Sequence, residues 1–187
     1  ELDADLEDVQ IQVSATAVDE STASAIDSAA EALGATVAAD AVNFAISAIS
    51  GEESAAVDLG NQYVNYALPV DGEIDSNKAT AVIFVDGELY FVPSTFSDGA
   101  ASILSNRNSI YTVVEMDKTF ADVPAGHWAE EDIHVLANKL IVFGMSETTF
   151  DLNRDITRAE FASLLVRSLG LGGTEANASF SDVEADK

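Results

Sequence analysis

Two different spacings of apolar residues divide the chain. In residues 9–118, short runs alternate between apolar and polar side chains; in VQIQVSA, for example, Val9, Ile11 and Val13 fall on one face. Alternation with a period of two is typical of a strand with one buried face. From Phe120 onward, apolar residues recur every three or four positions, as in amphipathic helices. We therefore expect an α+β protein, in which a sheet region precedes a helical region.

About seven short strands are expected in the sheet region. Two β-rich runs flank Asp86-Gly87, a pair that suits a type I′ hairpin turn because both positions take a positive φ. Another run ends at Pro69. The number of strands and their turns favour an antiparallel β-sandwich. The runs are VQIQVSA, VNFAIS, QYVNYALP, ATAVIFV, ELYFVP, ASILS and SIYTVVE.

One helix is predicted inside the sheet region, within DESTASAIDSAAEALG. Asp19 or Ser21 is expected to cap its start, and Gly34 is expected to end it. We expect this helix to pack on one edge of the sandwich. Its apolar face consists of residues at positions i, i+3, i+4 and i+7, namely Ile26, Ala29, Ala30 and Leu33.

The helical region is predicted to form two helices joined by a loop over residues 120–171. The first helix should end at Gly144 and bury one apolar face, which consists of Ile133, Leu136, Ala137, Leu140 and Ile141. The second begins with Thr157 and Glu160, which have the spacing of a capping box. Its buried stripe should continue through Leu164, Leu165 and Leu169, and Gly170-Leu171 fits a Schellman stop. A unit of about 50 residues is small for a core of its own, so we expect it to need neighbours, as repeat units do.

A short motif occurs twice in the chain. TFADV at residues 119–123 returns as SFSDV at residues 179–183, after the spacer LGGTEANA. The segments TFADVPAGHWAEEDIHVLANKLIVFG and TTFDLNRDITRAEFASLLVRSLGL closely resemble a surface-layer homology (SLH) repeat in their motifs F-x-D-V, H-W-A, I-T-R-A-E-F-A and L-x-L-G-L. The predicted domains are a β-sandwich module at 1–118, one full repeat at 119–172, and a linker with the start of a truncated second repeat at 173–187.

This resemblance implies both a fold and a function. SLH repeats come in threes, form a pseudo-threefold helical bundle, and attach bacterial surface proteins non-covalently to pyruvylated secondary cell-wall polysaccharide. The resemblance thus implies an extracellular protein of the bacterial cell wall or surface layer (S-layer). Residues 1–118 resemble, more loosely, the β-sandwich module that precedes such repeats in Gram-positive surface proteins.

Arg158 is the first candidate for polysaccharide binding. It should occupy the first helical position after the cap, where a cation opposes the helix dipole, so its placement indicates a role outside the helix. A guanidinium beside a helix N-terminus suits a carboxylate, and a pyruvyl ketal carries one. The alternative is a local ion pair with Asp155 or another acid. The resemblance points to the same T-R-A-E residues and adds Thr157 to the site.

Trp128, Asp122 and Gly144 complete the predicted site, each with a structural alternative. Trp128 is the only tryptophan, and its indole can stack on a sugar or lock the first helix into the core. Asp122 can line the binding groove or act as a turn or cap residue. Gly144 can let a ligand approach the backbone or end the helix.

Motifs for catalysis and metal binding are missing from the sequence. Cysteine is absent, and no G-x-S-x-G, P-loop or Rossmann glycine pattern occurs, so we expect no enzymatic activity. His127 and His134 lie seven positions apart, whereas a zinc helix would place them four apart. The D-x-N-x-D segment at residues 151–155 lacks the later residues of an EF-hand. No cofactor is expected, and calcium stays an open alternative.

The net charge of −25 narrows the range of partners. Residues 1–118 hold 21 acids and 3 bases, so −18 of this charge lies in the sheet region. Such a field repels nucleic acid and anionic membranes. No apolar run is long enough for membrane insertion. Two alternatives to wall anchoring stay open: self-association into a lattice or filament through strand edges, with calcium neutralising the acidic region, and an accessory module of a secreted polysaccharide-degrading enzyme.

Overall fold

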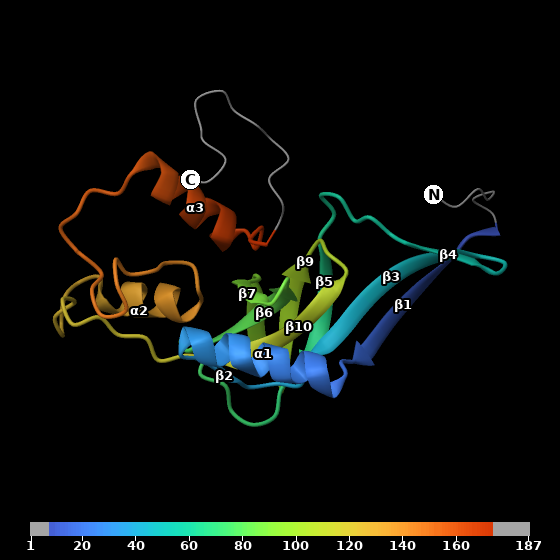
Figure 1. Cartoon of the computed structure of the whole chain (residues 1–187), viewed down its shortest axis with the longest axis horizontal. Coiled ribbons are helices and arrows are strands. Elements are labelled where there is room, and N and C mark those ends of the chain that lie inside the picture. Colours follow the sequence, from blue (N-terminus) through green and yellow to red (C-terminus); the bar gives the residue numbers. More distant parts are fainter. Residues whose placement is uncertain (1–7, 174–187) are drawn as a thin grey trace.

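The computed structural model describes residues 8–173. The predicted linker and second repeat start, at residues 173–187, lie outside this range apart from Gly173. The described part is mixed α/β, with three helices and two sheets in which every strand pair is antiparallel (Figure 1). None of the helices within residues 8–173 has the length and apolar character needed to cross a membrane.

The larger sheet has seven strands. They are β1 (Gln10–Ala17), β2 (Thr36–Val37), β3 (Val42–Ser50), β4 (Glu53–Ala56), β6 (Ala79–Val85), β7 (Glu88–Phe91) and β10 (Ser109–Glu115). The main path of the sheet runs β1-β3-β10-β6-β7, with β2 paired to β10 and β4 paired to β3. Strands β1, β3 and β4 extend away from the rest of the molecule as an arm (Figure 1).

The smaller sheet shares a core with the larger one. Its strands, in the order β5-β9-β8, are β5 (Val64–Pro69), β8 (Ser94–Ser97) and β9 (Ala100–Ser105). Inside this core the rings of Phe44, Tyr66 and Tyr111 pack with centroids 4.8 to 6.1 Å apart. Burial raises the pKa of Tyr111 to about 12, since the charged phenolate would lose its hydration there. The aromatic cluster therefore joins strands from both sheets.

Helix α1 (Glu20–Leu33) covers the face of the larger sheet that points away from the smaller sheet. Its two ends are as predicted: the carboxylate of Asp19 accepts a hydrogen bond from the backbone of Thr22, and Gly34 ends the helix with φ 75°. The predicted position on a sheet edge is wrong. Ile26 and Ala30 are buried in a second core with side chains of the sheet, because they can exclude more water on its face than at its edge.

Every predicted strand is present, and three further strands occur in the described residues. These are β2, β4 and β8, which have two to four residues each. The Asp86-Gly87 turn has positive φ at both residues, as expected. A second turn of this kind, Asp98-Gly99, joins β8 to β9. Short strands rich in small or polar residues carry too little alternation to be recognised in advance.

The helical region contains α2 (Glu130–Asn138) and α3 (Arg158–Ser168). A small core of Phe120, Val123, Ala129, Ile133 and Ala137 surrounds α2. The prediction that Gly144 ends this helix is wrong. The helix stops at Asn138, and the turn that follows places Leu140 at a φ of 57°.

The early end of α2 has a tertiary cause. A left-handed conformation costs a residue other than glycine about 1–2 kcal/mol. Leu140 is only 5% exposed and packs into the second core beside Ile26 of α1. Burial of a leucine contributes about 1.5–3 kcal/mol, which offsets the strain of the turn. A side chain from the helical region thus belongs to the core of the sheet region.

Helix α3 has the predicted ends and an unexpectedly exposed apolar side. The capping box of Thr157 and Glu160 is complete. The Schellman hydrogen bonds also form, with the N–H of Gly170 donating to Arg167 and that of Leu171 donating to Val166. No residue of α3 is buried, so the predicted buried stripe is wrong for the described chain. Phe161, Leu165 and Leu169 are 48 to 56% exposed, because no described segment packs over them.

Candidate functional site

The start of α3 is held by charge-assisted hydrogen bonds. The carboxylate of Glu160 accepts from the guanidinium of Arg154 at 2.6 Å and from the backbone N–H of Thr157 at 2.8 Å. These bonds, that from Arg154 first, lower the pKa of Glu160 to about 2. The hydroxyl of Thr157 contacts the same carboxylate at 2.8 Å. Thr157 and Glu160 are therefore occupied within the helix cap.

Arg158 differs from its neighbours because it is unpaired. It is exposed, and within residues 8–173 its side chain makes no hydrogen bond or ion pair. The alternative of an ion pair with Asp155 is therefore wrong for the described structure. The backbone N–H groups of Arg158 and Ala159 also lack a hydrogen-bond acceptor in this part of the chain. Arg158 and two free backbone N–H donors thus lie in the first turn of α3, where they are available to bind an anion.

Asp122 has the structural role that was predicted as the alternative to ligand binding: its carboxylate bonds the backbone of a turn. One carboxylate oxygen accepts from the N–H of Phe150 at 2.8 Å, and the other accepts from that of Asp151 at 2.7 Å. These backbone hydrogen bonds lower the pKa of Asp122. The F-x-D-V motif therefore holds the loop that leads to α3. A role for Asp122 in polysaccharide binding stays a prediction.

Trp128 lies on the surface just before α2. Its side chain is 87% exposed, so the alternative in which it locks the helix into the core is wrong. Its ring lies 5.6 Å from that of His127, centroid to centroid. The indole face is thus available for stacking on a ligand, which is how aromatic side chains bind flat apolar surfaces.

Gly144 is needed for close packing. A Cβ atom at this position would lie 2.5 Å from the Phe120 ring and 2.5 Å from the Thr149 carbonyl oxygen. Gly144 also lines a hollow of about 380 Å³ between α3 and the preceding loop. None of the other four predicted site residues lines that hollow. In the described residues, no hydrogen bond, ion pair or ring contact joins Trp128 to Arg158.

No metal centre is formed by the side chains that the structure describes. Groups of three or more histidine or acidic residues with suitable geometry do not occur in residues 8–173. In the D-x-N-x-D segment, Asp151 has φ 69° and its carbonyl oxygen accepts from the N–H of Arg154. This segment is a turn whose backbone is already hydrogen-bonded.

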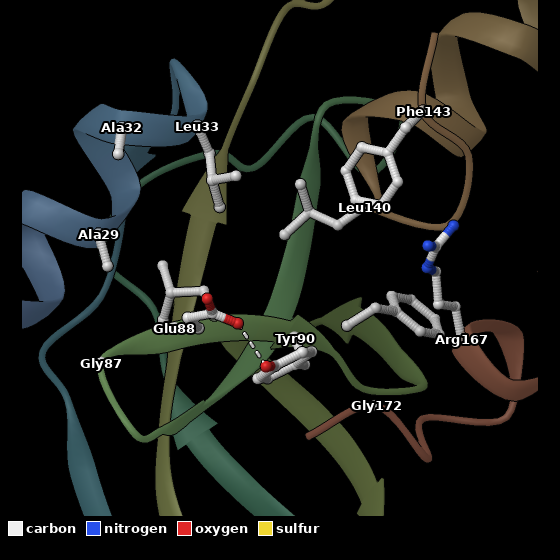
Figure 2. Close-up of a pocket in the computed structure, with 12 residues that line it drawn as sticks. Ala29, Ala32, Leu33, Gly87, Glu88, Tyr90, Leu140, Phe143, Arg167 and Gly172 are labelled. Atoms are coloured by element: carbon white, nitrogen blue, oxygen red, sulfur yellow. Dashed lines mark hydrogen bonds between the residues drawn. The ribbon is translucent and has the colours of Figure 1, made fainter. Parts of the chain in front are cut away.

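A hollow at the seam between the sheet and helical regions was not predicted. It measures about 530 Å³ and is lined by α1, β7 and residues of the helical region. In Figure 2, Leu33 of α1 lies on one side, and Phe143 and Arg167 lie on the other, with Tyr90 between them. The guanidinium of Arg167 lies 4.6 Å from the centre of the Phe143 ring. No local motif could reveal this hollow, because its walls come from segments far apart in the sequence.

Comparison with known families identifies one part of the chain. Residues 119–162 match the family model of the S-layer homology domain, so this segment is an SLH domain. The match confirms the resemblance for these residues and covers less than a quarter of the chain. The number of repeats and the identity of the preceding module stay predictions. No solved structure matches the chain.

Curated relatives include both enzymes and surface proteins. An amylopullulanase of Thermoanaerobacterium thermosulfurigenes is 32% identical over 155 residues, 77% of this chain and 8% of that protein. The outer membrane protein SlpA of Thermus thermophilus is 48% identical over 50 residues, 27% of this chain and 6% of that protein. An S-layer protein of Bacillus licheniformis is 38% identical over 73 residues, 38% of this chain and 8% of that protein.

The relatives also show how the match is distributed. The chain spans less than a tenth of the length of these three proteins. Residues 119–187 make up little more than a third of the chain, so the amylopullulanase alignment must extend into the sheet region. The SLH domain and the S-layer relatives indicate a location at the cell surface, in association with the cell wall.

Proposed function

We propose that this chain contributes to the non-covalent anchoring of a surface protein, through binding of its SLH domain to pyruvylated secondary cell-wall polysaccharide. The observation that carries the proposal is the unpaired, exposed guanidinium of Arg158 at the start of α3, inside the segment that matches the SLH domain. SLH domains are non-catalytic anchoring modules, and several relatives are S-layer proteins. The sheet region would be a β-sandwich module joined to the first repeat of an anchoring array.

The chemistry of the ligand fits the groups at the start of α3. A pyruvyl ketal places a carboxylate on a sugar, and a carboxylate binds most strongly to a guanidinium combined with backbone N–H donors. Arg158 supplies the guanidinium, and the first turn of α3 supplies the donors. Trp128 would add stacking on a sugar ring.

The exposed side of α3 supports the idea of neighbouring repeats. The helix presents Phe161, Leu165 and Leu169 to solvent in the described chain. An apolar stripe of this kind normally packs against another element. A following repeat, which the second F-x-D-V motif at residues 179–183 would begin, is the expected neighbour.

Co-sedimentation with purified cell-wall sacculi tests the anchoring proposal. The chain should pellet with intact sacculi and stay in the supernatant when acid has stripped the attached polysaccharide. Arg158→Ala should weaken binding by roughly tenfold or more, because it removes a charge-assisted contact worth about 1.5–3 kcal/mol. Trp128→Ala should weaken it as well, while Trp128→Phe should retain part of the affinity.

Lys78→Ala is the matched control for Arg158→Ala. It removes the same charge from an exposed ion pair with Asp117 in the sheet region, outside the SLH domain. Its binding should equal that of the parent chain. Failure of the parent chain to bind intact sacculi, or equal binding before and after stripping, would contradict the proposal.

Self-assembly through β1 is the second candidate function, and one observation favours it. Strand β1 pairs only with β3 among the described strands, and its sequence QIQVSATA carries no charge. Ile11 and Val13 are 62% and 66% exposed. Natural proteins usually protect a free strand edge with charges, so an uncharged edge in an acidic chain suits pairing with a second copy.

Measurement of mass in solution distinguishes this second function from anchoring. If β1 joins two chains, the dimer fraction should rise with ionic strength, because salt screens the repulsion between two chains of charge −25. Val13→Lys should abolish the dimer, and Ser24→Lys on the exposed side of α1 should not. A monomer at every salt concentration would exclude assembly through β1. The third interpretation, an accessory module of a secreted enzyme, rests on the alignment with the amylopullulanase and concerns the whole protein.

A further inference from the structure

One arginine of the sheet region forms hydrogen bonds at the C-terminal end of α3. Arg107, in the turn between β9 and β10, extends its guanidinium to the carbonyl groups of three glycines beyond the helix. One nitrogen donates to Gly172 at 2.7 Å and to Gly170 at 3.4 Å, and the other donates to Gly173 at 3.3 Å. The contacts bridge 63 to 66 positions of sequence. The set of residues 170–173 with Arg107 is called the glycine clasp below.

The backbone of Arg107 is itself fixed from inside the sheet core. The hydroxyl of Tyr111 donates to the carbonyl oxygen of Arg107 at 2.6 Å. Tyr111 is fully buried in the aromatic cluster that joins the two sheets. The guanidinium therefore projects from a rigid turn, which is what a positioning residue requires.

The glycines of the clasp pack closely against side chains of the sheet region. A Cβ atom on Gly170 would lie 2.5 Å from the ring of Pro93, and one on Gly172 or Gly173 would lie 2.8 or 2.9 Å from the ring of Tyr90. Such approaches are below normal contact distances, so side chains at these positions would push α3 away from the sheet. Glycines here allow the backbone to reach Arg107.

The C-terminal end of α2 is held by the sheet region in a similar way. The ammonium of Lys139 donates to the carbonyl oxygens of Ser76 at 2.9 Å and Ala79 at 3.2 Å. The side chain of Asn138 donates to the carbonyl oxygen of Asn77 at 3.1 Å. Both helices of the SLH domain therefore end on the sheet region.

Helix α3 needs such support for a physical reason. An isolated helix of 11 residues is marginal in water, and α3 buries no residue that could stabilise it by packing. The guanidinium of Arg107 lies just beyond the C-terminal end of α3, where a cation complements the helix dipole, and it bonds carbonyl groups of the segment that follows the helix. The hydroxyl of Tyr63 adds a bond to the carbonyl oxygen of Leu169 at 3.3 Å.

We infer that the sheet region is an orienting platform for the SLH domain, and that Arg107 is the positioning residue that fixes the C-terminal end of α3 and residues 170–173 on the sheet region. This role deepens the proposed anchoring function and rests on it for its biological meaning. The start of α3, which carries Arg158, is then held in place from the opposite end of the helix.

A distance measurement by pulsed electron paramagnetic resonance tests the platform without any ligand. The chain has no cysteine, so Thr95→Cys and Ala162→Cys introduce two labelling sites, both exposed, one in the smaller sheet and one on α3. The parent pair should give one narrow distance distribution. Arg107→Ala should at least double its width, and Arg107→Lys should give an intermediate width, because an ammonium keeps the charge but cannot span three carbonyls.

Two further variants separate positioning from general stability. Gly172→Ala disturbs the clasp from the helical side, leaves the sheet sequence intact, and should widen the distribution as Arg107→Ala does. Lys78→Ala removes an equal charge from the sheet region and should leave it narrow. A narrow distribution in both Arg107→Ala and Gly172→Ala would overturn the inference, whatever the result with sacculi. A widened distribution with unchanged sacculus binding would retain the platform and reject its role in anchoring.

Discussion

At the scale of residues, the motif side chains of the SLH domain fall into two groups: those that form hydrogen bonds within the protein, and one that has no partner. Asp122, Thr157 and Glu160 are engaged in hydrogen bonds to the loop and the helix cap. Arg158 is adjacent to Thr157 in the sequence, but its side chain has no hydrogen-bond or ion-pair partner in the described structure. Motif residues of one domain thus divide into a structural group and a candidate binding group, and only the structure tells them apart.

Glu160 should titrate well below its ordinary pKa of 4.5, at about 2. Because the folded-state pKa is depressed, its contribution to stability is present above pH 4.5 and is lost as the pH falls towards about 2. NMR titration of the side-chain carboxyl carbon measures this directly. Arg154→Ala should raise the pKa, since the arginine is the first cause of the shift. A pKa near 4.5 in the parent chain would contradict the capping geometry.

Gly144→Ala should destabilise the SLH domain by about 1–3 kcal/mol, the usual effect of overpacking. The new methyl group would lie 2.5 Å from Phe120 and from the Thr149 carbonyl oxygen. Urea unfolding measures the change in the free energy of unfolding. Ser163→Ala on the exposed side of α3 is the control and should change it by less than about 0.5 kcal/mol. Equal stability of both variants would show that the loop moves easily.

At the scale of elements, the location of each element decides what its apolar residues contribute. Helix α1 and strand β1 adjoin in sequence and carry similar side chains. Helix α1 packs across the larger sheet, whereas β1 belongs to an arm with solvent on both faces. The same residue type therefore has a different energetic role in each.

Ile26→Ala and Ile11→Ala form a matched pair for this difference. Ile26 is 1% exposed, so truncation should cost about 2–5 kcal/mol of unfolding free energy. Ile11 is 62% exposed, and the same truncation should cost less than about 0.5 kcal/mol. Urea unfolding of both variants is the measurement. Similar losses at both positions would mean that the arm is covered in solution.

At the scale of the whole molecule, the sheet region and the SLH domain share contacts on both sides of Thr119. Leu140 completes the core under α1, Arg107 holds the glycine clasp, and Asn138 joins two backbone segments. Contacts of this number and kind favour one cooperative unfolding transition for residues 8–173.

Asn138→Ala should weaken this connection. Asn138 is 4% exposed, accepts from the N–H of Lys118 at 2.7 Å and donates to the carbonyl oxygen of Asn77. Its loss leaves two backbone groups without partners, which costs about 1–3 kcal/mol. Calorimetry should show a lower melting temperature for Asn138→Ala than for the parent chain. Asn153→Ala, whose side chain is exposed, should leave the melting temperature unchanged. A second, separate transition in the parent chain would contradict a shared unit.

Local features of the molecule were predictable from the sequence alone. The helix caps at Asp19 and Thr157, the Asp86-Gly87 turn and the F-x-D-V and T-R-A-E motifs of the SLH domain could all be read directly. Each depends on residues within a few positions of one another, so their spacing is enough to define the geometry. The sequence also placed Arg158 at the first turn of α3.

Only the tertiary structure decided how these pieces meet. It placed α1 on a sheet face, ended α2 before Leu140, left Trp128 exposed and brought Arg107 to the end of α3. The positions of α1, Leu140 and Arg107 depend on partners tens of positions away, whose burial or hydrogen bonding outweighs the local preference. The spacing of residues along the sequence does not identify such partners, because the number of residues between two positions does not determine their distance in the folded protein.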